Sequence, residues 1–391
     1  MKKLLPWLLA GLVLRLLLIP ISLHPDFRAV NLAGYLISQK GQTFSFYDYL
    51  SRQPRTDRWV QLYGDNLFIY PPLAYITHAV FNKALFWAYP QTAFFTLLND
   101  IGQLRQDLGF PLLMYLLKLP YLLADGICLL ILSRLLPAKN KLIGQLVWLF
   151  NPITIYSAYL MGQFDIFIAL FLLLTLYFSP KNPILSAVSL GLSAAFKPFV
   201  LVLAPLLPGN SVKNLLISGL TYFATLLPYL FSPAFRQYAL LASQSDKLFF
   251  AKIMISGSQY LPLFLVGLIL IYFWRYFKPA TYSLVGWLSL PLFLFFSLTH
   301  YHPQWFTWFA PILTYLFATD NKTRLPILAL VTSFLVVVFS FDPSLNFQLI
   351  NSDLLLKIPD LYTSIARGIF AGTALYLTFH LQAASHGQSK S

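Results

Sequence analysis

Residues 110–135 read FPLLMYLLKLPYLLADGICLLILSRL, and only Lys118 and Asp125 are charged before Arg134. This run is apolar over more than the roughly 20 residues that a helix needs to cross a hydrocarbon layer. A run of this length and composition predicts a membrane-spanning helix.

Apolar runs of the same kind recur along the chain, at 4–23, 142–160, 164–179, 183–207, 213–231, 259–277, 282–299, 303–318, 325–341 and 363–382. Hydrophobic residues make up 58% of the chain and charged residues 10%, and the mean hydropathy is +0.67. Soluble domains carry about 25% charged residues, so this composition cannot build a water-exposed surface. We therefore expect an all-α polytopic membrane protein, a single transmembrane domain over 1–391 with about 11–13 spanning helices.

The distribution of Lys and Arg predicts the orientation, because cytoplasmic helix ends are enriched in both. The residues assigned to the cytoplasm are Lys2, Lys3, Arg134, Lys139, Lys141, Lys181, Arg275, Lys278, Lys322 and Arg324. This assignment makes 24–109 a long external loop with interfacial or re-entrant helices, followed by the remaining helix bundle at 110–391. It also makes 183–207 a hairpin that enters and leaves on one side, broken at Lys197-Pro198. We expect both termini in the cytoplasm of a prokaryotic cell, with the first run retained in the plasma membrane as an anchor.

Composition and motifs argue against several classes of function. The net charge is +14, but positive charge at helix ends near anionic lipid explains it without nucleic acid. Cys128 is the only cysteine, which excludes an intrachain disulfide and makes a thiolate metal site implausible. Walker A, G-x-G-x-x-G and H-E-x-x-H motifs are absent, so we expect no ATP hydrolysis, dinucleotide or zincin chemistry and no cofactor, with a divalent metal left open.

Ionisable residues inside apolar runs are costly unless they are paired or hydrated. Arg15 either extends toward lipid headgroups or holds a phosphate. Lys118 and Asp125 lie nearly two helical turns apart, about 10 Å, so each is expected to pair with a neighbouring helix. In that case each residue belongs to a structural ion pair that fixes the bundle. The alternative is that Lys118 borders a substrate cavity.

Carboxylates also stand at two predicted helix starts. Asp26 follows Pro25 just outside the first run, and Asp165 ends Gly162-Gln163-Phe164-Asp165 at the start of another. Either residue could simply be a helix N-cap, and the helix dipole also favours Asp165. Asn151-Pro152 indicates a proline kink.

The densest polar cluster is His300-Tyr301-His302-Pro303-Gln304. Its two histidines lack a third metal ligand nearby in the sequence. Hydrogen bonding to a phosphate or a sugar hydroxyl, or an interfacial location with no function, remain the alternatives.

Taken in order, these residues resemble the GT-C superfamily of multi-spanning glycosyltransferases, which use polyprenyl-phosphate sugars. The chain is most similar to the branch that contains GPI mannosyltransferase I catalytic subunits and their bacterial relatives. The resemblance is carried by Arg15, Asp26, Tyr35, Tyr70-Pro71-Pro72, Lys118, Asp125, Phe150-Asn151-Pro152, Ser157, Gly162-Gln163-Phe164-Asp165, Lys197-Pro198 and His300-Tyr301-His302-Pro303-Gln304. In that family an Asp of the first external loop acts as general base, and Asp26 matches it. Arg28 stands where a second acidic residue is usual, which argues against a metal-dependent variant.

The resemblance implies a GT-C-like bundle that moves a hexose from a polyprenyl-phosphate donor, and the branch implies that this hexose is mannose. The acceptor would be a lipid-linked glycan, a glycolipid or a protein on the external face, and single displacement would invert the anomeric centre. The cations expected near the donor phosphate are Lys197, Arg15 and His302. The other residues expected to bind substrate are Tyr70, Lys118, Gln163, Asp165, His300 and Gln304. A transporter or lipid-linked sugar flippase, and a non-catalytic membrane subunit, are the alternatives.

Overall fold

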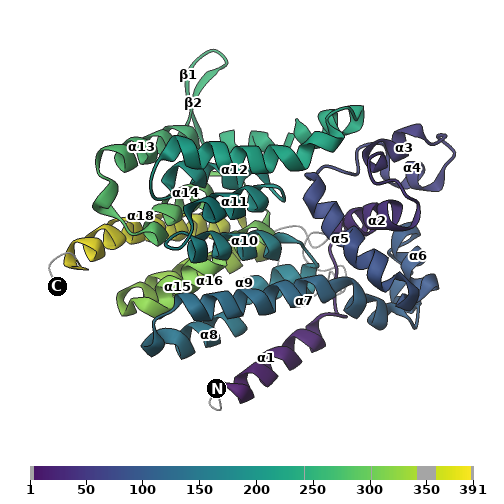
Figure 1. Cartoon of the computed structure of the whole chain (residues 1–391), viewed down its shortest axis with the longest axis horizontal. Helices are drawn as coiled ribbons and strands as arrows, with labels where there is room; N and C mark the ends of the chain where they lie inside the picture. The colour runs from purple at the N-terminus through teal and green to yellow at the C-terminus, as the bar shows by residue number, and fades with distance from the viewer. Residues whose placement is uncertain (1–3, 242, 301, 341–357, 389–391) are drawn as a thin grey trace.

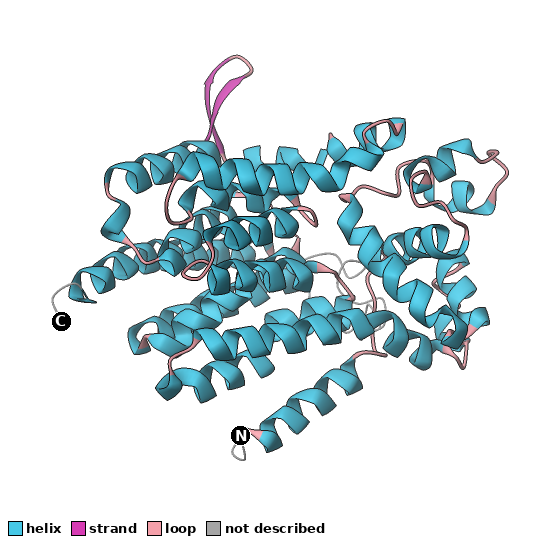
Figure 2. Ribbon diagram, in the orientation of Figure 1, coloured by secondary structure: helices cyan, strands magenta, loops and turns pink. Residues whose placement is uncertain are grey.

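The structure, a computed structural model, describes residues 4–241, 243–300, 302–340 and 358–388. Helices make up most of the described chain, and two short strands form one hairpin (Figure 1; Figure 2). The prediction of a predominantly helical fold is therefore confirmed.

Two described helical segments are long and apolar enough to cross a membrane. They are α7 (Phe110–Leu135) and the segment Asn321–Phe339, which contains α16 (Arg324–Phe339). The shorter apolar helices are α1 (Leu5–Leu18), α10 (Asp165–Phe178), α11 (Pro183–Ala194), α13 (Leu263–Phe277), α14 (Leu284–Leu298) and α15 (Ala310–Thr319). At 1.5 Å per residue, a helix of 14 residues is about 21 Å long, less than the roughly 30 Å of a hydrocarbon core. The predicted runs remain apolar beyond these helices, but the regular helix stops early.

An asparagine followed by a proline explains one early stop within a predicted run. The run 142–160 is divided into α8 (Lys141–Leu149), the single turn α9 (Pro152–Thr154) and the π-helix η5 (Ile155–Met161). The Asn151 side chain accepts a hydrogen bond of 2.9 Å from the Ile153 N–H group and so caps a new helix. Asn151-Pro152 therefore separates two helices, and the predicted kink within one helix is wrong.

The run 183–207 is broken at Lys197-Pro198 and folds back on itself, as the sequence predicted for its shape. Helix α11 and the 3₁₀-helix η6 (Pro198–Leu206) pack against each other on either side of Lys197, and α12 (Ser211–Leu226) packs against both. The run 259–277 differs from its prediction, because its first residues form a strand. Strands β1 (Lys252–Ser256) and β2 (Gln259–Pro262) make an antiparallel hairpin that projects from the bundle (Figure 1), and α13 begins only after Pro262.

Residues 24–109 form a helical layer at one end of the bundle, far from the C-terminus (Figure 1). Its helices are α2 (Asp26–Gln39), α3 (Tyr49–Arg52), α4 (Arg58–Tyr63), α5 (Pro72–Leu85) and α6 (Gln91–Asn99). Helices α2 and α5 approach closely at Gly34, where an added Cβ would lie 3.3 Å from the carbonyl carbon of His78. The buried Asp48 carboxylate ties the layer to the bundle, because it accepts hydrogen bonds from the Ser232 hydroxyl (2.8 Å) and the Ala234 N–H group (3.0 Å). The layer is thus a packed part of the fold.

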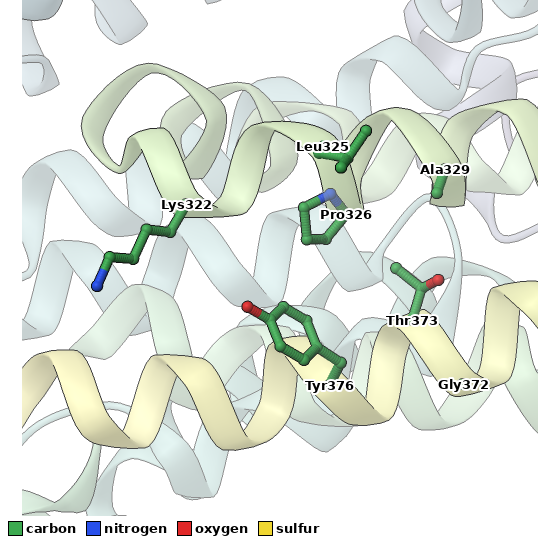
Figure 3. Close-up of a pocket in the computed structure, with 7 residues that line it drawn as sticks. All are labelled: Lys322, Leu325, Pro326, Ala329, Gly372, Thr373 and Tyr376. Carbon is green, nitrogen blue, oxygen red and sulfur yellow. The ribbon is translucent and has the colours of Figure 1, made fainter.

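The last described helix, α18 (Asp360–Gln388), packs against α14 and α16. Between α16 and α18 lies a cavity of about 440 Å³, whose lining includes Lys322, Pro326, Gly372 and Tyr376 (Figure 3). None of the predicted site residues lines it.

Candidate functional site

A backbone contact brings the two carboxylate segments together. The His24 N–H group donates a hydrogen bond of 2.8 Å to the carbonyl oxygen of Met161, directly before Gly162-Gln163. Gly162 has φ +71°, a left-handed conformation that favours glycine, and an added Cβ would lie 3.1 Å from the ring of Phe27. The chain that leaves α1 therefore lies against the chain that enters α10.

Asp26 is the first residue of α2, and Pro25 occupies the N-cap position. The Asp26 carboxylate caps no N–H group of its own helix, so the N-cap interpretation is wrong. Its Oδ2 atom instead accepts a hydrogen bond of 2.9 Å from the Tyr70 hydroxyl, and the Gln163 Nε2 atom lies 3.5 Å away. Burial and the charge of Asp26 raise the pKa of Tyr70, which remains a proton donor. The Asp26 side chain is 35% exposed, so a fixed carboxylate remains accessible.

His24 contacts both the backbone of Asp26 and the side chain of Gln163. The His24 Nδ1 atom accepts hydrogen bonds from the Asp26 N–H group (3.1 Å) and from Gln163 Nε2 (3.1 Å). Because Nδ1 is an acceptor, the ring proton of His24 lies on its own Nε2 atom. Burial lowers the pKa of His24, the nearby charge of Lys197 lowers it further, and Asp26 opposes both. A neutral His24 therefore orients the Gln163 amide beside Asp26.

Asp165 and Lys197 form a buried ion pair. The Asp165 Oδ1 atom accepts hydrogen bonds from Lys197 Nζ (2.7 Å) and Trp308 Nε1 (2.6 Å). Phe164 is the N-cap of α10, and no side chain caps this helix, so the N-cap interpretation of Asp165 is also wrong. The Asp165 Oδ2 atom is buried and has no hydrogen-bond partner among the described residues.

Aromatic rings surround the Lys197 ammonium. Its Nζ atom lies between 5.1 and 5.5 Å from the ring centroids of Tyr70, Phe164, Trp305 and Trp308. The 3₁₀-helix η11 (Pro303–Trp308) has three residues per turn, which places Trp305 and Trp308 on one side with their rings stacked. The adjacent side carries Gln304, whose buried Oε1 atom has no partner among the described residues.

A second lysine reaches the same aromatic group from the 3₁₀-helix η9 (Ser243–Phe249). Lys247 Nζ lies 5.2 Å from the centroid of the Trp305 ring and contacts His302 Nε2. Burial and the charge of Lys197 lower the pKa of Lys247 to about 8. Burial and the charges of both lysines lower the pKa of His302 to about 3, so His302 is neutral.

Most of the predicted site residues therefore lie together. We define the Asp26 cluster as His24, Asp26, Tyr70, Gln163, Asp165, Lys197, Lys247, His302, Gln304, Trp305 and Trp308. His300 lies at its edge, with its ring centroid 6.3 Å from that of His302. Tyr301 falls outside the described residues.

Arg15 and Lys118 do not reach this cluster. The Arg15 guanidinium donates to Asp125 at 2.6 Å and to the Leu149 carbonyl oxygen at 2.7 Å, deep in the bundle. Neither headgroup contact nor phosphate binding fits this position. Lys118 is fully buried against backbone carbonyl groups, so its predicted location at a substrate cavity is also wrong.

Sequence reasoning gave no role to His24, Lys247, Trp305 or Trp308. Trp305 and Trp308 follow the predicted His300–Gln304 cluster directly, and a 3₁₀ spacing of three would have indicated that they share a face. Lys247 stands in a polar stretch far along the chain from Asp26, and nothing local to it marks a site.

Among the described residues, no three His, Cys, Asp or Glu side chains are grouped as metal ligands. Comparison of this chain with protein-family models, curated proteins and solved structures found no match.

Proposed function

We propose that the chain is an integral membrane glycosyltransferase that moves a hexose from a polyprenyl-phosphate donor to an acceptor hydroxyl. The observation that carries this proposal is the charge arrangement of the Asp26 cluster. A fixed, accessible carboxylate stands near two lysines, and one of them, Lys247, is bonded to a neutral histidine and to no acid of the described chain. Acceptor activation needs such a base, and a departing phosphate needs such a cation.

In the proposed reaction, Asp26 accepts the proton of the acceptor hydroxyl. The hydroxyl oxygen then bonds to the anomeric carbon, and the bond from that carbon to the donor phosphate oxygen breaks through an oxocarbenium-like state. The electron pair leaves with the polyprenyl phosphate, whose charge Lys247 and Lys197 stabilise. Direct displacement inverts the anomeric centre. Asp165 Oδ2 and Gln304 Oε1 lack hydrogen-bond partners among the described residues but are buried, so hydroxyl groups of the sugar would reach them only after the cluster opens.

We further propose that the shorter apolar helices cross the bilayer together with their 3₁₀ and π continuations, with 24–109 outside and the termini in the cytoplasm. Irregular backbone at membrane depth is compatible with lipid where protein buries it. The hairpin at Lys197 and the π-helix η5 are both largely buried, which supports this arrangement.

Labelling of single cysteines tests the orientation. In intact cells, an impermeant maleimide is expected to label Arg105→Cys, whereas Lys139→Cys is expected to react only after permeabilisation. Both residues are exposed and lie in short 3₁₀-helices, η3 (Leu104–Gln106) and η4 (Ala138–Asn140), and the native Cys128 is buried. Labelling of both positions from the same side would contradict the orientation.

The lowered pKa of Lys247 predicts a pH-dependent donor affinity. The ammonium is the form that binds phosphate, so affinity is expected to be highest below pH 7 and to fall as the pH rises through about 8. Arginine remains charged throughout this range. Lys247→Arg should therefore remove the fall, and Lys247→Met should bind donor weakly at every pH. Donor titrations between pH 6 and 9 measure this. The same fall in Lys247→Arg would assign the dependence to another group.

Radiolabel transfer from a panel of polyprenyl-phosphate hexoses to acceptor lipids tests the proposed activity itself. A labelled glycosidic product from one member of the panel is expected. Movement of intact donor across the bilayer, with no new glycosidic bond, would instead favour the flippase alternative, for which the broken helices beside the cluster are the supporting observation.

A further inference from the structure

Two buried charged residues that the proposed mechanism does not use, Lys118 and Asp125, share one face of α7. The Lys118 Nζ atom donates hydrogen bonds to three backbone carbonyl oxygens, those of Ile19 (2.8 Å), Ser22 and Tyr159 (2.7 Å). An ammonium has three N–H donors, and all three are used. The positive charge also complements the carbonyl groups at the C-terminal end of α1.

Asp125, nearly two helical turns further along α7, holds the same two segments, α1 and η5. Its Oδ2 atom accepts hydrogen bonds from Arg15 of α1 (2.6 Å) and from the Tyr159 hydroxyl of η5 (2.6 Å), and Oδ1 accepts one from Trp148 (2.7 Å). Tyr159 is thus fastened to α7 twice, through its hydroxyl at Asp125 and through its carbonyl at Lys118. Helix α1 is fastened in the same way, through the Arg15 side chain and through the carbonyl groups that follow it.

Both fastened segments continue directly into the Asp26 cluster. Ser22 lies two residues before His24, and Tyr159 lies four residues before Gln163. Gly162 is in contact with this arrangement, because an added Cβ would lie 3.1 Å from Lys118 Cε. The geometry points to Lys118 and Asp125, which we call the α7 clamp, as positioning residues that fix Asp26 relative to Gln163 and Asp165.

Lys118→Met separates positioning from general stability. Methionine has a similar length and no N–H donor, and no carboxylate of the described chain loses a partner. Amide hydrogen exchange of the purified protein is expected to rise about tenfold in peptides covering 20–27 and 157–166, and to stay unchanged in peptides from α14. Lys322→Met is the matched control, because it removes an exposed lysine in the 3₁₀-helix η12 (Asn321–Thr323). It should change exchange in neither region.

The catalytic arm of the test rests on the proposed function, and the exchange arm does not. A misplacement of about 1 Å costs on the order of 10²-fold in rate, so kcat of Lys118→Met is expected to fall on that scale while KM for the donor changes less than threefold. If wild type transfers no sugar, the proposed function fails and hydrogen exchange alone decides the clamp.

Tyr159→Phe provides a second variant, because it detaches η5 from Asp125 and leaves the ammonium in place. Exchange is expected to rise in 157–166 and to remain at the wild-type level in 20–27. Unchanged exchange at both segments in Lys118→Met, or an equal rise along the whole chain, would overturn the proposal. If Lys118→Met does not accumulate, unchanged exchange in Tyr159→Phe would overturn it.

Discussion

Asp26→Asn is expected to lower turnover by about 10²–10⁴-fold, the contribution typical of a positioned general base. The amide keeps the shape of the carboxylate, and its oxygen can still accept the Tyr70 hydroxyl bond that Oδ2 accepts now. It cannot accept the proton of the acceptor hydroxyl. Helix α2 should be unaffected, because Asp26 does not cap it. Turnover and thermal unfolding of the purified variant beside wild type measure the two effects separately.

Asp57→Asn is the matched control for this substitution. Asp57 lies in the same helical layer and caps α4 through hydrogen bonds from the Trp59 and Val60 N–H groups. Asparagine caps a helix about as well as aspartate, so this variant should retain full turnover. Near-normal turnover of Asp26→Asn would remove Asp26 from the mechanism and leave Asp165 as the acid of the cluster.

Lys197→Met is expected to destabilise the protein by about 3–5 kcal/mol, the usual cost of breaking one side of a buried ion pair. The variant leaves the fully buried Asp165 carboxylate with Trp308 as its donor and no cation. Turnover should be lost as well, but the loss of folding would obscure its cause. Thermal or denaturant unfolding in detergent measures the stability term.

The double variant Lys197→Met/Asp165→Asn separates the two roles of this lysine. Neutralising both partners removes the unpaired charge, so most of the lost stability should return. If Lys197 also contacts the donor phosphate, turnover of the double variant should remain low although its stability is restored. Recovery of both stability and turnover would restrict Lys197 to neutralising Asp165.

The apolar runs predicted where helices occur more reliably than where they end. The run 110–135 coincides with α7 because no residue within it stops the helix, and Pro120 is accommodated inside. Elsewhere local chemistry ended the helix within an apolar run, as at Asn151, where a side-chain cap begins a new helix, and at Pro262, where a strand precedes α13. Hydropathy reports how apolar a segment is. It does not report where a side-chain cap or a strand ends a helix within that segment.

The sequence identified most polar residues of the candidate site, but it did not identify which charged residues pair with each other. Asp26 and Gln163 stood out as polar residues beside apolar runs and Lys197 as a charge within one, and the structure brings them together. The partner of each charge depended on contacts between distant parts of the chain, such as Arg15 with Asp125 and Lys197 with Asp165. Spacing within one helix carries no information about such pairs, so the sequence offered lipid headgroups or a phosphate as the partner of Arg15, whereas its partner is a carboxylate.

In the proposed function, this chain forms a glycosidic bond with Asp26 as the base. The most direct test of this proposal places wild type and Asp26→Asn in proteoliposomes that contain a radiolabelled polyprenyl-phosphate hexose and an acceptor lipid. We predict a labelled glycosidic product with inverted anomeric configuration from wild type, and a rate lower by about 10²–10⁴-fold from Asp26→Asn at equal donor binding. Absence of product from wild type with every hexose of the panel, or equal rates from both proteins, would contradict the proposal.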